Sequence, residues 1–131
     1  MDTVLFTLPV PSTALLRSPE FEMGLGRKCR LKYVYEFNQT SELIEDTLEF
    51  DGVESFKITY YTANSLDVFQ AYGKLIEMHK SEWLDEIRLN LQSSKSDTNG
   101  LKHFRIYFDD GPCYEFIART IEVLTGPTPL T

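Results

Sequence analysis

The chain has 131 residues, of which 42% are apolar and 25% are charged, and its formal net charge at neutral pH is −7. This composition excludes an intrinsically disordered chain, which combines low hydrophobicity with high net charge. The length predicts a single domain over residues 1–131. The negative charge argues against a general nucleic-acid-binding protein, because such proteins displace counterions from phosphate with a basic face.

The cysteines and the apolar segments indicate the cellular setting. Cys29 and Cys113 are too few for a disulfide scaffold and fit no zinc-binding spacing, so we expect reduced thiols. No apolar run is long enough to span a membrane. The apolar stretch 4–10 follows Asp2 instead of a basic segment, which argues against a signal peptide. We therefore expect a cytoplasmic protein that does not bind a membrane.

The first 26 residues show the weakest pattern of the chain. Residues 3–8 predict a short strand, and the prolines after it place it at a sheet edge. Residues 9–26 contain Pro19 and two glycines, which indicate turns. Their role stays open beyond a loop whose apolar side chains pack onto the domain, namely Leu15, Leu16 and Phe21.

Residues 30–37 predict a strand, because apolar and polar residues alternate along them. The face that we expect to point to the core carries Leu31, Tyr33, Tyr35 and Phe37. The basic run 27–32 enters this strand, and we expect its cations at a solvated strand edge instead of an anion-binding patch. Residues 38–41 are small and polar, and they predict a turn.

Residues 43–61 predict a β-hairpin, since an Asp-Gly pair at 51–52 separates two alternating runs. A three-residue loop would pair Leu48 with Phe56 and bring the large apolar residues to one face. A two-residue loop would divide them between both faces, so the first register is expected. Together with residues 30–37, this hairpin predicts a three-stranded antiparallel meander.

Residues 65–92 predict two helices, at about 65–79 and 82–92, or one bent helix. Ser65 and Ser81 are suitable N-cap residues. Apolar side chains come after them at helical spacing, which is typical of a helix that packs on a sheet. These side chains are Val68, Phe69, Tyr72, Leu75, Ile76, Trp83, Leu84, Ile87 and Leu91.

The C-terminal part combines a clear strand with an ambiguous segment. Residues 92–100 are small and polar and predict a surface loop. Residues 102–109 alternate as a strand does, and the turn at 109–111 is expected to set the register of the final segment. Residues 113–124 fit a helix or a strand that pairs back on 104–108, and their composition slightly favours the strand.

Taken together, these segments predict an α+β domain. Runs of strands, then helices, then strands again are typical of that class. We expect an antiparallel sheet of five to six strands, with helices at about 65–79 and 82–92 packed on one face.

The sequence carries no recognisable catalytic or cofactor-binding motif. It has no phosphate-binding glycine loop and no GxSxG motif, so we expect no cofactor and assign no catalytic residue. A metal site would need His103 and Asp109 to converge, but six residues of strand separate them by about 20 Å. By the same reasoning Cys113 would lie near the turn and away from His103, so we predict neither a metal site nor a Cys-His pair.

Aromatic residues on the predicted strands suggest one candidate pocket. A curved sheet under a helix can enclose an aromatic-lined cavity, although such side chains more often form the core. A carboxylate with a shifted pKa inside that cavity would indicate a functional role. The candidate pocket residues are Tyr33, Tyr35, Glu36, Glu54, Tyr60 and Glu115.

Two functions remain compatible with these observations. The expected one is a non-catalytic protein-binding or accessory module, since exposed strand edges can pair with another protein or with a second copy of the chain. The alternative is a small-molecule binder or enzyme that uses the aromatic pocket between the sheet and the helices. The residues choose neither a partner nor a ligand.

Overall fold

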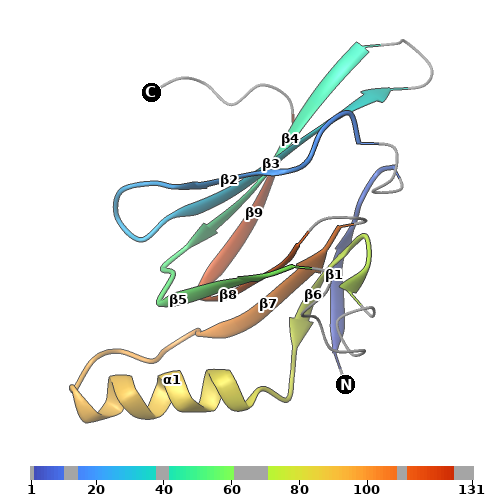
Figure 1. Ribbon diagram of the computed structural model, residues 1–131. Helices are drawn as coiled ribbons and strands as arrows, with labels where there is room; N and C mark the ends of the chain where they lie inside the picture. Colours follow the sequence, from blue (N-terminus) through green and yellow to red (C-terminus); the bar gives the residue numbers. More distant parts are fainter. Residues whose placement is uncertain (1, 11–14, 38–41, 61–70, 109–111, 126–131) are drawn as a thin grey trace.

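The computed structural model describes residues 2–10, 15–37, 42–60, 71–108 and 112–125, which form nine strands and one helix (Figure 1). The strands are β1 Thr3–Thr7, β2 Glu20–Met23, β3 Cys29–Phe37, β4 Glu42–Asp51, β5 Ser55–Thr59, β6 Lys74–Met78, β7 Lys102–Tyr107, β8 Cys113–Ala118 and β9 Thr120–Thr125. The helix is α1 Glu82–Ser93.

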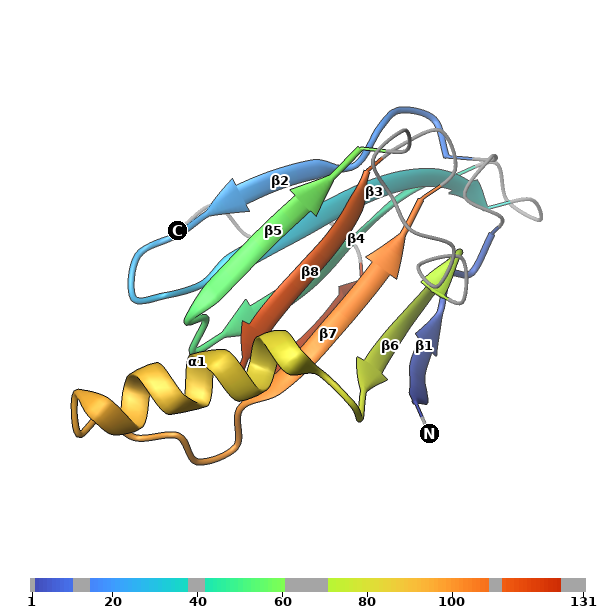
Figure 2. The same cartoon turned by 60° about the horizontal axis from the view of Figure 1, so that its bottom comes forward.

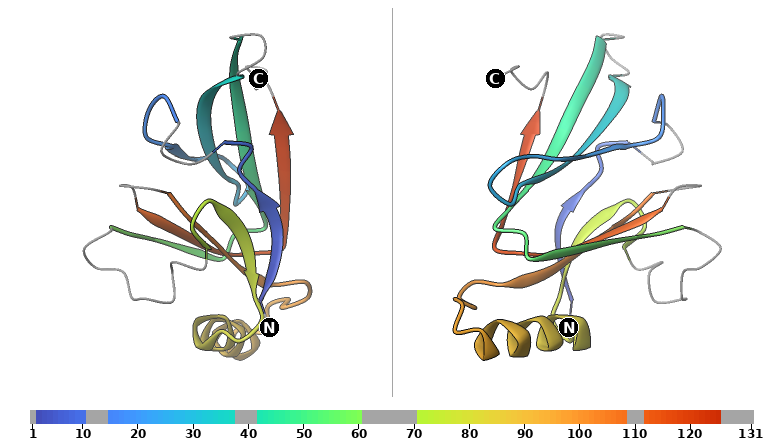
Figure 3. Two further views of the ribbon diagram at one scale, coloured as in Figure 1. Left: turned by 90° about the vertical axis from the view of Figure 1, so that its right-hand side faces the viewer. Right: turned by 60° about the vertical axis from the view of Figure 1, so that its left-hand side comes forward.

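The strands form two antiparallel sheets in separate layers. The five-stranded sheet has the order β1-β6-β7-β8-β5, and the four-stranded sheet has the order β2-β3-β4-β9. Helix α1 lies on the outer face of the five-stranded sheet, turned away from the four-stranded sheet (Figure 3). The chain changes sheet between β1 and β2, after β4, and again at Arg119, between β8 and β9.

The main hydrophobic core lies between the two sheets and is rich in aromatic rings. Phe50 of the four-stranded sheet stacks on Phe116 of the five-stranded sheet, with ring centroids 3.9 Å apart. The predicted inward face of β3 is confirmed for Leu31, Tyr33 and Tyr35, which are all buried, whereas the side chain of Phe37 lies outside the described part. Stacked rings from facing sheets therefore hold the two layers together.

The predicted α+β class is wrong. The described residues form a mostly β structure with one helix and two antiparallel sheets, instead of one sheet of five to six strands under two helices. Strand-like alternation identifies most of the strands correctly. Alternation shows which face of a strand is buried, but it does not show to which sheet the strand belongs. The sequence therefore predicted one sheet where the chain forms two.

The predicted hairpin at 43–61 is also wrong, although both of its strands exist. β4 pairs with β3 and β9, whereas β5 pairs with β8 in the other sheet. Leu48 and Phe56 do face the same core, but from opposite layers. Gly52 has a φ of 65° at the crossing, so the left-handed backbone expected for a hairpin loop serves a change of sheet.

The helix predicted at about 65–79 is contradicted where the structure describes it. Residues 65–70 lie outside the described ranges, and Lys74–Met78 form strand β6. Leu75 packs in the main core, while its neighbour Ile76 packs in a second cluster with Tyr107. A strand covered on both faces carries consecutive apolar residues, and these resembled a helical stripe.

The second predicted helix and the final strand are confirmed. α1 begins after Ser81, whose side chain caps it by accepting from the N–H of Leu84 at 3.0 Å. Residues 113–124 form strands instead of a helix, divided at Arg119 into β8 and β9. β8 pairs back on β7 as expected.

The N-terminal expectations are met in part. β1 lies at the edge of the five-stranded sheet, as its flanking prolines predicted. Leu15 and Phe21 pack against the core, whereas Leu16 is exposed. The short strand β2 was missed, because four residues give too little alternation to recognise. The turns expected at 38–41 and 109–111 lie outside the described residues.

Candidate functional site: a groove between two sheet edges

A groove of about 460 Å³ lies where the β2–β3 turn approaches the crossing from β4 to β5. We call it the β2–β5 groove. Its lining combines apolar and charged side chains: Met23, Gly24, Arg27, Lys28, Cys29, Val53, Glu54, Ser55 and Phe56.

The groove is bordered by the edges of both sheets. β2 ends the four-stranded sheet and β5 ends the five-stranded sheet, so among the described residues each pairs on one side. The two strands run side by side in Figure 2, and Phe21 of β2 contacts Phe56 of β5 with ring centroids 5.0 Å apart. The sandwich is therefore open along this side, with aromatic rings filling the interior behind the opening.

A backbone hydrogen bond closes one end of the groove. The N–H of Val53 donates to the carbonyl oxygen of Arg27 at 3.0 Å, which ties the β2–β3 turn to the crossing. The turn itself is closed by Gly24 N–H, which donates to the carbonyl of Lys28 at 2.8 Å. Two apolar side chains stand out from this turn into solvent, since Met23 is 66% exposed and Leu25 is 96% exposed.

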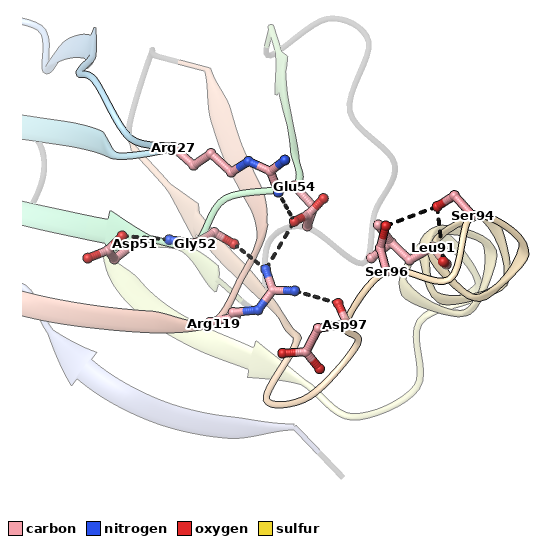
Figure 4. A network of polar contacts seen from close by, with 9 residues as sticks. All are labelled: Arg27, Asp51, Gly52, Glu54, Leu91, Ser94, Ser96, Asp97 and Arg119. Carbon is pink, nitrogen blue, oxygen red and sulfur yellow. Dashed lines mark hydrogen bonds and ion pairs between the residues drawn. The ribbon is translucent and has the colours of Figure 1, made fainter.

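Two guanidinium groups share one carboxylate at this end (Figure 4). Glu54 pairs with Arg27, and it also accepts from Arg119 Nη1 at 3.1 Å. The same Arg119 donates to the carbonyls of Gly52 at 3.1 Å and of Asp97 at 2.6 Å. Arg119 thus joins the crossing, the groove and the loop after α1.

The remaining cations of the basic run 27–32 are paired with acids on neighbouring strands. Lys28 lies 3.4 Å from Glu49, and Lys32 lies 3.3 Å from Glu22. Arg30 lies between these same two carboxylates, 3.1 Å from Glu49 and 3.6 Å from Glu22. Because these pairs neutralise the strand face, the run offers little free positive charge beyond the turn.

The six residues predicted to form a pocket lie in separate places. Tyr33 and Tyr35 are buried in the core with ring centroids 6.2 Å apart. Glu36 is exposed on β3, and Tyr60 is 72% exposed after β5. Glu54 lines the β2–β5 groove. The structure does not bring them together, because the predicted pocket assumed one sheet.

Glu115, the sixth of these residues, is buried on the outer face of the five-stranded sheet. Its carboxylate accepts from Arg105 Nε at 2.8 Å and contacts His103 Nε2 at 2.9 Å. Burial alone would raise the pKa of Glu115, but the hydrogen bonds from His103 and Arg105 outweigh it and lower the pKa. Glu115 is thus held as a carboxylate.

A second buried carboxyl group, Asp46, escaped the sequence reasoning. It lies on the inner face of β4, where the hydroxyl of Tyr35 donates to its Oδ2 at 3.2 Å. Burial raises the pKa of Asp46, and the hydrogen bond from Tyr35 only partly opposes this effect. The position was detectable in principle, because Asp46 shares the alternation of Leu48 and Phe50 and so faces the core.

The groove cations were likewise missed, since Arg27 and Arg119 are 92 positions apart in the chain and meet only through the crossings. Among the described residues, no group of three or more His, Cys, Asp or Glu side chains could hold a metal ion. The described part of the chain also has no helix long and apolar enough to cross a membrane. Comparison with family models, curated proteins and solved structures yields no match to this chain.

Proposed function

We propose that this protein is a protein-binding module that receives an extended segment of a partner protein in the β2–β5 groove. The observation that carries the proposal is that two sheet edges, β2 and β5, border the same groove. An extended segment gains main-chain hydrogen bonds by adding to a sheet edge, and side-chain pockets beside that edge supply selectivity.

The lining of the groove indicates the chemistry of the segment. Met23, Val53 and Phe56 offer apolar surface, while the guanidinium of Arg27 is 66% exposed at the rim. Glu54 is shared between two guanidinium groups, so an incoming carboxylate can pair with the exposed guanidinium of Arg27. A segment with an acidic residue beside an apolar one complements this surface, although the whole chain has a net charge of −7.

Selection from a display library of short random peptides tests this proposal. Selected peptides should combine acidic and apolar residues, and in amide NMR spectra they should shift β2, β5 and the turn between β2 and β3. Arg27→Glu and Met23→Asp should each weaken binding about tenfold, which equals about 1.4 kcal/mol. Lys74→Glu is the matched control, because Lys74 is exposed on β6 and carries the same change of charge.

Three outcomes would contradict the proposal. The first is equal binding of the selected peptides to the parent protein and to both groove variants. The second is a set of shifted amides that excludes β2 and β5. The third is a concentration-dependent shift of the groove amides without peptide, which would assign the groove to a second copy of the chain.

A further inference from the structure

Beneath the start of α1, on the side of the five-stranded sheet that faces away from the core, three side chains form a line. The Oγ of Ser81 lies 2.7 Å from Nδ1 of His103, and Nε2 of His103 lies 2.9 Å from Oε1 of Glu115. They come from the cap of α1, from β7 and from β8. The side chains of His103 and Glu115 are 5% and 4% exposed, so bulk water barely reaches them.

The cations around Glu115 determine where the protons lie. Arg105 Nε donates to Glu115 at 2.8 Å, and Lys57 Nζ lies 3.8 Å from its second oxygen, so the group is an ionised carboxylate that only accepts. His103 must then donate from Nε2. With Nε2 donating, Nδ1 of the neutral imidazole accepts, and the hydroxyl of Ser81 at 2.7 Å can donate to it.

This is the proton arrangement of an activated serine, in which a base accepts from the hydroxyl and an acid orients the base. We propose that Ser81 is a nucleophile for acyl transfer, with His103 as its general base and Glu115 as the group that orients His103. The inference is independent of the β2–β5 groove, since none of these three residues lines it.

Ser81 also lines a surface cavity of about 590 Å³ at the start of α1. The other lining residues are His79, Lys80, Glu82, Leu84, Asp85 and Arg88. Six of the seven lining side chains are polar or charged, so the cavity suits a carboxylic ester with a small, polar acyl group. The backbone N–H groups of Glu82 and Trp83, in the first helical turn, have no acceptor within the helix and can face a developing oxyanion.

The reaction balances with water as the second substrate. Ser81 Oγ forms a bond to the carbonyl carbon of the ester while its proton passes to Nδ1 of His103. The tetrahedral intermediate then breaks the bond to the alcohol oxygen, which takes that proton and leaves. A water molecule that enters through the cavity beside Ser81 attacks the acyl carbon with His103 again as base. The proton then returns to Ser81 Oγ as its bond to the acyl carbon breaks and the carboxylic acid departs.

Because the same hydroxyl caps α1, loss of stability on substitution would not distinguish a catalytic role from a structural one. Asparagine caps a helix about as well as serine but has no nucleophilic oxygen, so Ser81→Asn separates the two roles. Ser93→Ala is the matched control, because Ser93 is an exposed serine at the other end of the same helix.

The test uses a fluorophosphonate probe with intact-mass detection, together with hydrolysis of p-nitrophenyl acetate. The parent protein and Ser93→Ala should form one adduct, mapped to Ser81, and Ser81→Asn should form none while its circular dichroism stays unchanged. His103→Gln should label about 100-fold more slowly or worse, because a general base supplies that much.

A folded parent protein that forms no adduct at Ser81 on prolonged exposure would overturn the proposal. So would an adduct on another residue, or hydrolysis by Ser81→Asn at the parent rate. In each of these cases the line of three side chains is a helix cap and nothing more.

Discussion

Replacing Glu115 with glutamine should cost the fold about 3 kcal/mol. The carboxylate is 4% exposed and lies within 2.9 Å of both Arg105 and His103, with Lys57 at 3.8 Å. Removing one partner of a buried ion pair typically costs about 3–5 kcal/mol, because the remaining charge loses its compensation. Glutamine keeps one acceptor oxygen, so the lower end of that range is expected.

Urea unfolding followed by tryptophan fluorescence measures this loss. The single tryptophan, Trp83, packs edge-on against His103 with ring centroids 5.1 Å apart, so its emission reports on this cluster. Glu86→Gln is the matched control, because Glu86 is exposed on α1, the helix that carries Trp83. This substitution should change the free energy of unfolding by less than about 0.5 kcal/mol. A loss below about 1 kcal/mol for Glu115→Gln would refute the reasoning.

The pH dependence of stability gives an independent check on Glu115. The pKa of Glu115 is lowered in the folded state, so its contribution to stability is present above the pKa that a glutamate has in the unfolded chain, which is about 4.3. That contribution is lost as the pH falls through the lower folded pKa. The parent should therefore lose more stability below about pH 4 than Glu115→Gln does, and parallel curves would contradict the ionised state of Glu115.

Three further predictions concern the core and the crossing. Asp46→Asn should raise the melting temperature at pH 7. Burial raises the pKa of Asp46 in the folded state, so the stability that this group contributes is present at low pH and is lost as the pH rises through the folded pKa. An unchanged or lower melting temperature would contradict this reasoning. Phe116→Ala should cost about 3–5 kcal/mol in urea unfolding, because it removes a buried ring stacked on Phe50, and a loss under about 1.5 kcal/mol would contradict the packing. Gly52→Ala should lower stability by about 1 kcal/mol or more, because φ is 65° and a Cβ would lie 2.9 Å from Cδ of Arg119. An unchanged melting temperature would contradict the left-handed backbone conformation at Gly52.

The parts of the fold that the sequence predicted correctly are those set by local alternation. β3 and β7 each bury alternate residues between the sheets, which a period of two identifies without knowledge of the partner strand. The helix cap at Ser81 is equally local, because its hydroxyl accepts from the N–H of Leu84, three residues later, without any tertiary contact. For the same reason the helix predicted at 82–92 was placed nearly residue for residue.

The errors share a different cause, which is burial on two faces. β6 carries Leu75 and Ile76 in succession because the sheet is covered on both sides, and such a run has no diagnostic period. The outer face of β7 is buried as well, so His103 and Arg105, which alternate with Phe104 and Ile106, are also covered. Charged residues on a covered face must be paired, and this pairing gave rise to the Glu115 cluster.

The candidate sites could be predicted only in part, because each depends on contacts between segments that are far apart in the chain. Glu54 was among the predicted pocket residues, yet its partners Arg27 and Arg119 come from the β2–β3 turn and from the crossing between β8 and β9. Ser81 and His103 are 22 residues apart, and only the docking of α1 onto β7 brings them into contact. No local pattern encodes such a meeting.

The crossings after β4 and at Arg119 also explain how the β2–β5 groove and the buried Glu115 cluster arise. At Gly52 the chain leaves the four-stranded sheet, so β5 adds to β8 and becomes an edge beside β2. At Arg119 the chain returns, and the side chain of Arg119 fastens both crossings through Gly52 and Glu54. Had residues 43–61 formed the expected hairpin, β5 would have paired with β4. The groove would then have lost the wall that β5 provides, and Glu115 on the outer face of β8 would have lost the Lys57 that now lies beside it.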